Sequence, residues 1–142
     1  MGTVRDGICP VQAQLEAYLD ELRRHLDLEA AVVFGSRARN DHWEKSDIDL
    51  LVVSPSFADW PASQRTDLLL DCWGGIPALE PFGVTPQELE GHGWLLLWDA
   101  LYEGRPLCDS GCFARAQARL HERMDHQELA RRLAGEAWRL MT

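Results

Sequence analysis

The sequence lacks any apolar run long enough to cross a membrane. A membrane-spanning helix needs about 20 consecutive apolar residues, and the longest candidate here is the short stretch from Trp94 to Trp98. The N-terminal residues also lack a basic start followed by an apolar stretch, so we expect no secretion signal. Because 46% of the 142 residues are nevertheless hydrophobic, these absences favour a globular, cytoplasmic protein over a membrane-bound one.

Cysteine is scarce and shows no spacing typical of a metal site. The four cysteines are Cys9, Cys72, Cys108 and Cys112. The last two lie close together in the sequence but lack a second pair of ligands. A disulfide framework is typical of short secreted chains. We therefore expect reduced thiols, as in a cytoplasmic protein.

Positive charge is scarce in most of the chain. The formal net charge is −9, from 14 Lys and Arg against 23 Asp and Glu. Residues 1–110 carry eight basic and nineteen acidic side chains, whereas residues 111–142 carry six arginines and four acids. A polynucleotide is bound by a track of basic side chains along its phosphates, and the acidic part has none. The negative charge therefore disfavours a nucleic-acid partner and favours a small molecule or a protein.

Short apolar runs bounded by turn residues alternate with helical patterns along the chain. This order predicts an α/β (α+β) chain with a small mixed sheet of about four strands flanked by helices. We expect one domain over residues 1–142, with its core at about 28–110 and a helical C-terminal segment at 112–142. Strands are predicted at 30–34, 47–53, 76–82 and 106–108, and helices at 10–26, 62–73, from 86 to an interruption at 91–93, 94–103, and from 113 onward with a break near 125.

A motif of small and acidic residues lies between the first two predicted strands. Gly35-Ser36 follows the first strand, and Asp47-Ile48-Asp49 begins the second. Strand alternation puts Asp47 and Asp49 on one face, about 7 Å apart at their Cα atoms. Carboxylates held in this way repel each other, and Mg²⁺ favours carboxylates together with substrate phosphates and water. Gly35 lets the backbone approach an anion closely, and Ser36 can cap a helix whose free N–H groups bind phosphate.

This pattern indicates phosphoryl or nucleotidyl transfer. Each part also has a simpler interpretation: two acids at a strand start are often solvated, and a serine after a strand is often a plain helix cap. The agreement of spacing, flanking strands and residue types favours the functional interpretation.

Gly-Ser followed after ten residues by Asp-x-Asp resembles the signature of the minimal nucleotidyltransferase (MNT) proteins, in the superfamily of DNA polymerase β. The resemblance covers about residues 28–110 and continues in the stretch EPFGVTPQE at 80–88. There the family has a third acid, usually Asp, shortly before a Thr-Pro-x-Glu helix start. Glu80 stands in that position, either as the third acid or as an ordinary strand-edge carboxylate. The resemblance implies the nucleotidyltransferase fold.

The resemblance also implies a catalytic site with two Mg²⁺ ions. Asp47, Asp49 and Glu80 would be the catalytic residues and the metal ligands, with the two ions about 4 Å apart. One ion would support the leaving pyrophosphate, and the other would activate the attacking hydroxyl.

A nucleotide, with ATP as the expected substrate, would occupy the other part of the motif. Gly35 and Ser36 would hold its phosphates through backbone N–H groups and the serine hydroxyl. Arg37 follows directly and would contact the triphosphate, or would be a surface charge on a short helix.

The same resemblance implies a protein partner, because MNT proteins are often paired with a HEPN-domain toxin and some attach AMP to a toxin tyrosine. We therefore expect a Mg²⁺-dependent nucleotidyltransferase that moves AMP from ATP to a hydroxyl of a HEPN-type toxin. Two alternatives stay open: a non-catalytic MNT-fold module that neutralises a partner by contact, and a small-molecule, antibiotic-modifying nucleotidyltransferase, which the short C-terminal segment disfavours. The sequence leaves open the nucleotide base and whether the chain forms a homo-oligomer.

Overall fold

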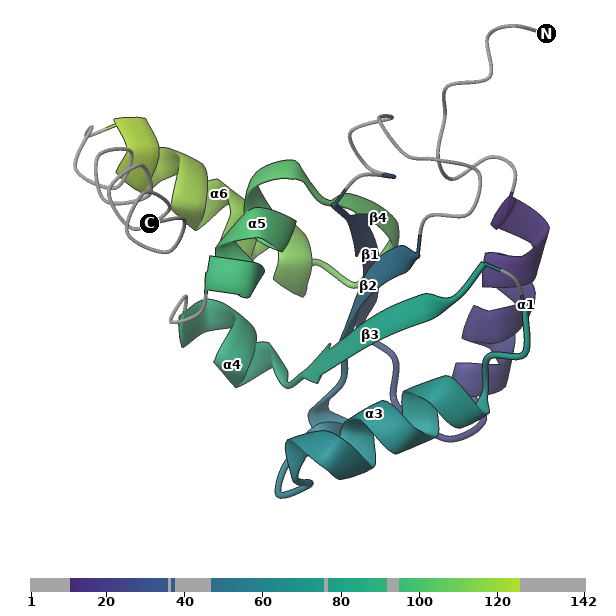
Figure 1. Ribbon diagram of the computed structural model, residues 1–142. Coiled ribbons are helices and arrows are strands. Elements are labelled where there is room, and N and C mark those ends of the chain that lie inside the picture. The colour runs from purple at the N-terminus through teal and green to yellow at the C-terminus, as the bar shows by residue number, and fades with distance from the viewer. Residues whose placement is uncertain (1–10, 36, 38–46, 76, 92–94, 126–142) are drawn as a thin grey trace, which may run out of the picture.

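The computed structural model describes residues 11–35, 37, 47–75, 77–91 and 95–125 (Figure 1). None of the helices within these ranges is both long and apolar enough to cross a membrane. The elements in chain order are α1 (Gln12–Leu22), β1 (Ala30–Phe34), β2 (Ile48–Val53), the 3₁₀ turn η2 (Pro55–Phe57), α3 (Ala62–Asp71), β3 (Leu79–Val84), α4 (Pro86–Gly91), α5 (Leu95–Glu103), β4 (Arg105–Asp109) and α6 (Cys112–Asp125).

The four strands form one mixed sheet in the order β3-β2-β1-β4. β1 runs antiparallel to both β2 and β4, whereas β2 and β3 are parallel. A parallel pair needs a crossover connection, and α3 provides it between β2 and β3. The predicted fold class, a small mixed sheet of four strands flanked by helices, is confirmed.

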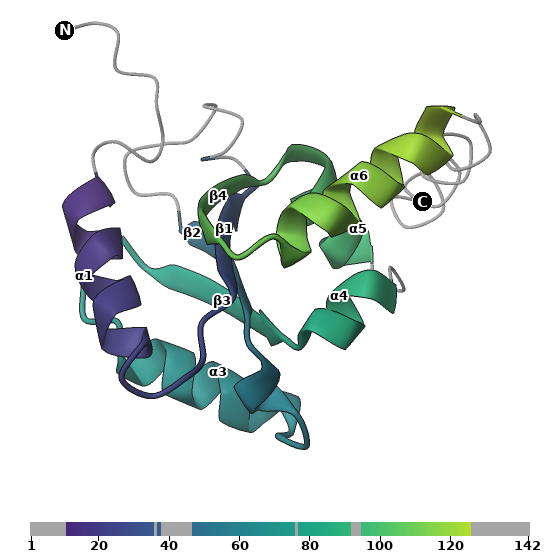
Figure 2. The same cartoon turned by 180° about the vertical axis from the view of Figure 1, so that it is seen from behind.

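Helices cover both faces of the sheet, with α1 and α3 on one face and α4, α5 and α6 on the other (Figures 1 and 2). The central strands β1 and β2 are apolar on both faces except at Asp49, as expected for strands buried between two helical layers. Alternate residues of β2 divide between two clusters: Leu50 and Val52 pack with α1 and α3, whereas Leu51 and Val53 pack with α5 and α6. The same alternation places Asp49 on the face covered by α5.

Most predicted elements are found, with differences at their ends. β1 has the predicted bounds, whereas β3 spans 79–84 rather than 76–82. Our prediction ended β3 too early because Pro81 and Gly83 usually interrupt strands. β3 lies at the edge of the sheet, where proline is tolerated, and its pairing with β2 continues to Val84. The predicted first helix is shorter, since α1 ends at Leu22, and the predicted break near 125 borders residues outside the described ranges.

Arg65 connects α3 to β3 and α4. Its guanidinium donates hydrogen bonds to both carboxylate oxygens of Glu88, at 2.6 and 3.2 Å, and to the carbonyl oxygens of Trp60 and Gly83, each at 3.0 Å. Glu88 also accepts from the backbone N–H of Thr85, whose hydroxyl accepts from the Glu88 N–H. This reciprocal pair is a capping box. The Thr-Pro-x-Glu helix start therefore also fixes the end of β3.

Replacing Glu88 by Gln should destabilise the protein at neutral pH. The hydrogen bonds from Arg65 lower the pKa of Glu88 below its ordinary value of 4.5. A lowered pKa contributes stability above pH 4.5 that is lost as the pH falls through the folded-state pKa. We expect the free energy of unfolding of the variant, measured by urea denaturation at pH 7, to be about 1 kcal/mol lower than that of the wild type. This difference in unfolding free energy should become smaller below pH 4.5.

Glu90→Gln, on the same helix, is the matched control. Its ion pair with Arg119 is exposed, with 53% of each side chain accessible, so we expect a change within about 0.5 kcal/mol. Equal losses for the two variants, or a difference that does not vary with pH, would contradict the role assigned to Glu88.

Candidate active site

Asp49 and Glu80 face each other at one end of the sheet. Each is the second residue of its strand, and the parallel register pairs them directly. Neighbouring strands lie about 4.8 Å apart, so the two side chains on one face meet. The Glu80 side chain lies within reach of the Asp49 carboxyl group and raises the pKa of Asp49. The structure therefore brings together two of the three acids predicted from the sequence.

The environment of Asp49 is unfavourable for a carboxylate. The pKa of Asp49 is raised from 3.8 to about 7. Burial is the largest cause, followed by the hydrogen-bonding interaction with Glu80 and the negative charge of Glu80, with smaller contributions from the charges of Asp47 and Asp99. Like charges held together in a partly buried place disfavour ionisation. Such a perturbed carboxyl group is typical of a functional site, and a nearby cation would favour its ionised form.

Gly35 is required by the close approach of Asp49. It follows β1 with a φ of +73°, in the left-handed region that favours glycine. A Cβ at this position would lie 2.2 Å from Oδ2 of Asp49. Phe34, the last residue of β1, pairs with Asp49 in the antiparallel register. The glycine therefore allows the chain to turn directly beside the carboxylate.

The other predicted site residues differ in what the structure says of them. Asp47 is exposed and lies one residue before β2, and its charge acts on Asp49. Arg37 is buried, with 2% of its surface exposed, and burial lowers its pKa. Of the two interpretations of Arg37, a triphosphate contact or a surface charge on a short helix, its burial disfavours the second. Ser36 lies outside the described residues.

Sequence reasoning missed the contribution of α5 to this site. Asp99 lies on α5, which covers the face carrying both carboxyl groups, and its negative charge acts on Asp49. Phe34 and Phe82 flank the acids on the same face, with ring centroids 5.9 Å apart. No local sequence pattern indicates Asp99 as a site residue, because only the packing of α5 against the sheet brings it close to Asp49.

Residues 15–140 match the nucleotidyltransferase domain family. The chain belongs to this family. The nucleotidyltransferase identity that the Gly-Ser and Asp-x-Asp motif indicated is thereby confirmed, and the chain is a nucleotidyltransferase domain. No curated protein matches the chain.

Three solved structures are similar to the chain. A candidate nucleotidyltransferase from Sulfolobus solfataricus is 19% identical, with a TM-score of 0.48, over 68% of this chain and 83% of that one. A toxin-antitoxin structure with AMP-PNP is 18% identical, with a TM-score of 0.44, over 80% and 91%. A mutant of the toxin-antitoxin MntA-HpeT is 16% identical, with a TM-score of 0.43, over 79% and 89%.

Replacing Gly35 by Ala should damage the fold at the site. The new Cβ would collide with the Asp49 carboxylate. The alanine would also have to keep a positive φ, which costs a residue other than glycine about 1–2 kcal/mol. We expect a loss of about 1–3 kcal/mol in urea denaturation. Gly74→Ala is the control, because nothing lies within 4 Å of its added Cβ. Equal stability of the two variants would show that Gly35 is not constrained as described.

Replacing Asp49 by Asn should stabilise the metal-free protein above pH 7. Because the folded-state pKa of Asp49 is raised to about 7, wild-type stability is lost as the pH rises from about 4 to 7, and Asn avoids this loss. We expect a higher melting temperature than wild type at pH 8 in EDTA, and little difference at pH 4. Asp67→Asn, which removes an exposed acid on α3, controls for net charge. A lower melting temperature for Asp49→Asn at pH 8 would mark the carboxylate as structural.

Proposed function

We propose that this nucleotidyltransferase transfers AMP from ATP to a hydroxyl group of a protein partner, at a site built from Asp47, Asp49 and Glu80. The observation that carries the proposal is the parallel register of β2 and β3, which sets Asp49 against Glu80. The close approach of Asp49 to Gly35 adds a backbone turn at which phosphate oxygens can be held. Membership of the nucleotidyltransferase family supports the class of reaction.

The acids suit Mg²⁺ by their chemistry. Mg²⁺ takes oxygen ligands, often one or two carboxylates together with substrate phosphates. Burial raises the pKa of Asp49, and the negative charges of Glu80, Asp47 and Asp99 add to the effect; a cation would offset these charges. Asp47 and Asp49 would hold one ion, and Asp49 and Glu80 a second. When bound, Mg²⁺ neutralises phosphate charge and lowers the pKa of the attacking hydroxyl.

The remaining residues position the substrate. The backbone after Gly35, with Ser36, would bind the terminal phosphates, and the positive charge of Arg37 close behind would favour their negative charge. Glu80, at the edge strand and exposed, would lie on the side from which the acceptor approaches. Catalysis would then consist of positioning the acceptor hydroxyl in line with the α-phosphorus and stabilising the charge that develops.

Charge favours a protein acceptor over a polynucleotide. The first 110 residues carry nineteen acidic side chains against eight basic ones, and such a surface repels nucleic acid. The resemblance to MNT proteins names the partner class: a HEPN-type toxin, with this chain as its antitoxin. Tyr, Ser or Thr of the partner would supply the hydroxyl.

The test combines the chain, labelled ATP and Mg²⁺ with the product of the neighbouring gene. We expect a mass increase of one AMP on a partner Tyr, Ser or Thr. Asp49→Asn should abolish labelling and Mg²⁺-dependent ATP binding by calorimetry. Glu80→Gln should leave ATP binding nearly unchanged and reduce transfer by orders of magnitude, because its part lies in activating the acceptor.

Each other result identifies a different activity. Label on RNA or on an aminoglycoside, with none on protein, would replace the proposed acceptor. A stable complex with the partner but no labelling would indicate the non-catalytic binding module. Equal affinity for ATP with and without Mg²⁺ or Mn²⁺ would contradict the metal site itself.

A further inference from the structure

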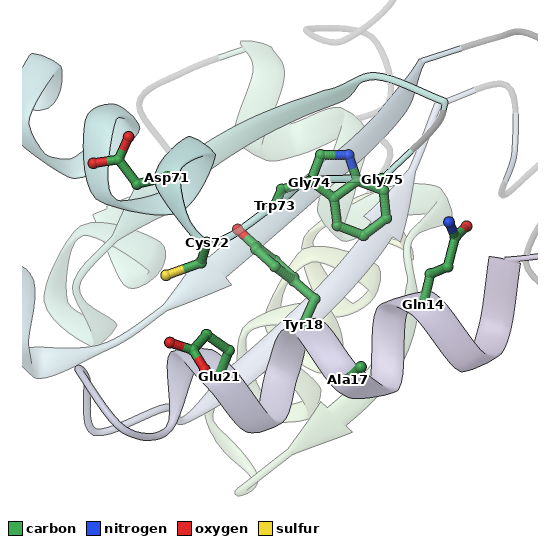
Figure 3. Close-up of a pocket in the computed structure, with 9 residues that line it drawn as sticks. All are labelled: Gln14, Ala17, Tyr18, Glu21, Asp71, Cys72, Trp73, Gly74 and Gly75. Atoms are coloured by element: carbon green, nitrogen blue, oxygen red, sulfur yellow. The ribbon is translucent and has the colours of Figure 1, made fainter.

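A pocket of about 470 Å³ lies between α1 and the C-terminal end of α3, on the face of the sheet opposite the acids (Figure 3). Its walls are held by specific contacts. Tyr18 and Trp73 pack edge to face, with centroids 5.3 Å apart. The Tyr18 hydroxyl donates to the carbonyl oxygen of Leu69 at 2.7 Å, and the Trp73 indole donates to that of Pro77 at 3.1 Å. The pocket is therefore a built feature of the α1–α3 layer.

Three side chains with metal-binding atoms meet at this pocket. One ligand atom each of Glu21, His25 and Cys72 lies within 4.8 Å of the other two. Glu21 and Cys72 line the pocket from α1 and from the end of α3, and Figure 3 shows them side by side. His25 follows Glu21 by four residues, with Nε2 3.1 Å from Glu21 Oε2. Two elements far apart in the sequence thus supply the group.

The donor set selects among metals. Mg²⁺ and Ca²⁺ prefer oxygen ligands, whereas a thiolate, an imidazole and a carboxylate together suit Zn²⁺. In a tetrahedral zinc site, sulfur and nitrogen ligands lie roughly 3.5 Å apart, given Zn–S of about 2.3 Å and Zn–N of about 2.0 Å. Atoms within 4.8 Å of one another would need to approach by at most about 1.3 Å. Exposed side chains such as His25 can make that adjustment by small rotations.

A simpler interpretation accounts for part of the group. Glu21 and His25 are four residues apart on a helical turn, and such exposed pairs are common and contribute only about 0.3–0.5 kcal/mol. This interpretation does not account for Cys72. Its sulfur comes from α3, is half-buried, and lies where the charges of both Glu21 and Asp71 act on it. A cation at this position would meet complementary charge from both.

We propose that Glu21, His25 and Cys72 form a Zn²⁺ site that joins α1 to α3, with the fourth ligand position open to the pocket. Three protein ligands and one open position are the arrangement of zinc sites that exchange water for another ligand. The site is independent of the proposed nucleotidyl transfer, because it uses different residues on the other face of the sheet. Zn²⁺ binding should stabilise the packing of α1 against α3, since only folding brings the three ligands together.

Cobalt substitution tests the site directly in the purified full chain. Co²⁺ is a spectroscopic substitute for zinc, and a Cys72 ligand should produce a thiolate-to-cobalt charge-transfer band in the near ultraviolet that saturates at one equivalent. Zn²⁺ should displace Co²⁺ and raise the melting temperature. Cys72→Ser should abolish the band. His25→Ala should weaken zinc binding by about 100-fold or more, because even groups that only hydrogen-bond to a ligand change affinity by about 10- to 100-fold.

Matched controls separate this site from other cysteines, histidines and acids. Cys108→Ser, on β4, and His121→Ala, an exposed histidine of α6, should keep the band and the zinc affinity. Asp49→Asn should keep both and lose only the Mg²⁺-dependent ATP binding, so failure of one site is distinguishable from failure of the other. Far-ultraviolet circular dichroism checks that each variant is folded.

Three results would overturn the proposal. One is the absence of a charge-transfer band in the wild type. Another is a band that persists in Cys72→Ser or disappears in Cys108→Ser. The last is a melting-temperature increase with Zn²⁺ that is the same in wild type, His25→Ala and Cys72→Ser, since that would show binding elsewhere on the chain.

Discussion

The parallel pairing of β2 with β3 is the constraint on which the candidate active site depends. It sets Asp49 opposite Glu80, and a shift of one residue would turn Glu80 to the other face of the sheet. Arg65 holds this pairing in place, because its hydrogen bonds reach the carbonyl oxygen of Gly83 within β3 and the carboxylate of Glu88 on α4. A buried guanidinium on the crossover helix thus ties the end of β3 to α3 and α4.

The site carries an electrostatic cost that the rest of the fold offsets. Asp49 is partly buried next to Glu80, with further negative charge from Asp47 and Asp99, and Gly35 adopts a positive φ to make room for it. The clustered negative charge opposes folding when the acids are ionised, whereas the positive φ has little steric cost for a glycine. Unfavourable local arrangements of this kind persist at functional sites because the surrounding structure enforces them. Here the two apolar clusters on either side of the sheet provide that support.

The two faces of the sheet offer different ligand chemistry. The face under α5 presents carboxylate oxygens, which favour Mg²⁺ and phosphate-bearing substrates. The layer of α1 and α3 presents sulfur, nitrogen and oxygen together at Cys72, His25 and Glu21, which favours Zn²⁺. Because α3 carries Arg65 at one point and ends beside Cys72 at another, the same helix contributes to both regions. Under the two proposals, a single small domain would separate two cations by ligand type.

Local patterns in the sequence determined the strand at 30–34, the turn at Gly35 and the family, because strand alternation, glycine conformations and motif spacing depend on neighbouring residues. They also placed an acid within the third strand, although toward its end rather than its start, and could not tell whether Glu80 was a site residue or a strand-edge carboxylate. Only the tertiary structure decided which distant side chains meet, since parallel pairing and helix packing join segments that carry no local mark of each other. The tertiary structure brings Asp49 close to Glu80 and to the charge of Asp99, and it brings Cys72 close to Glu21 and His25.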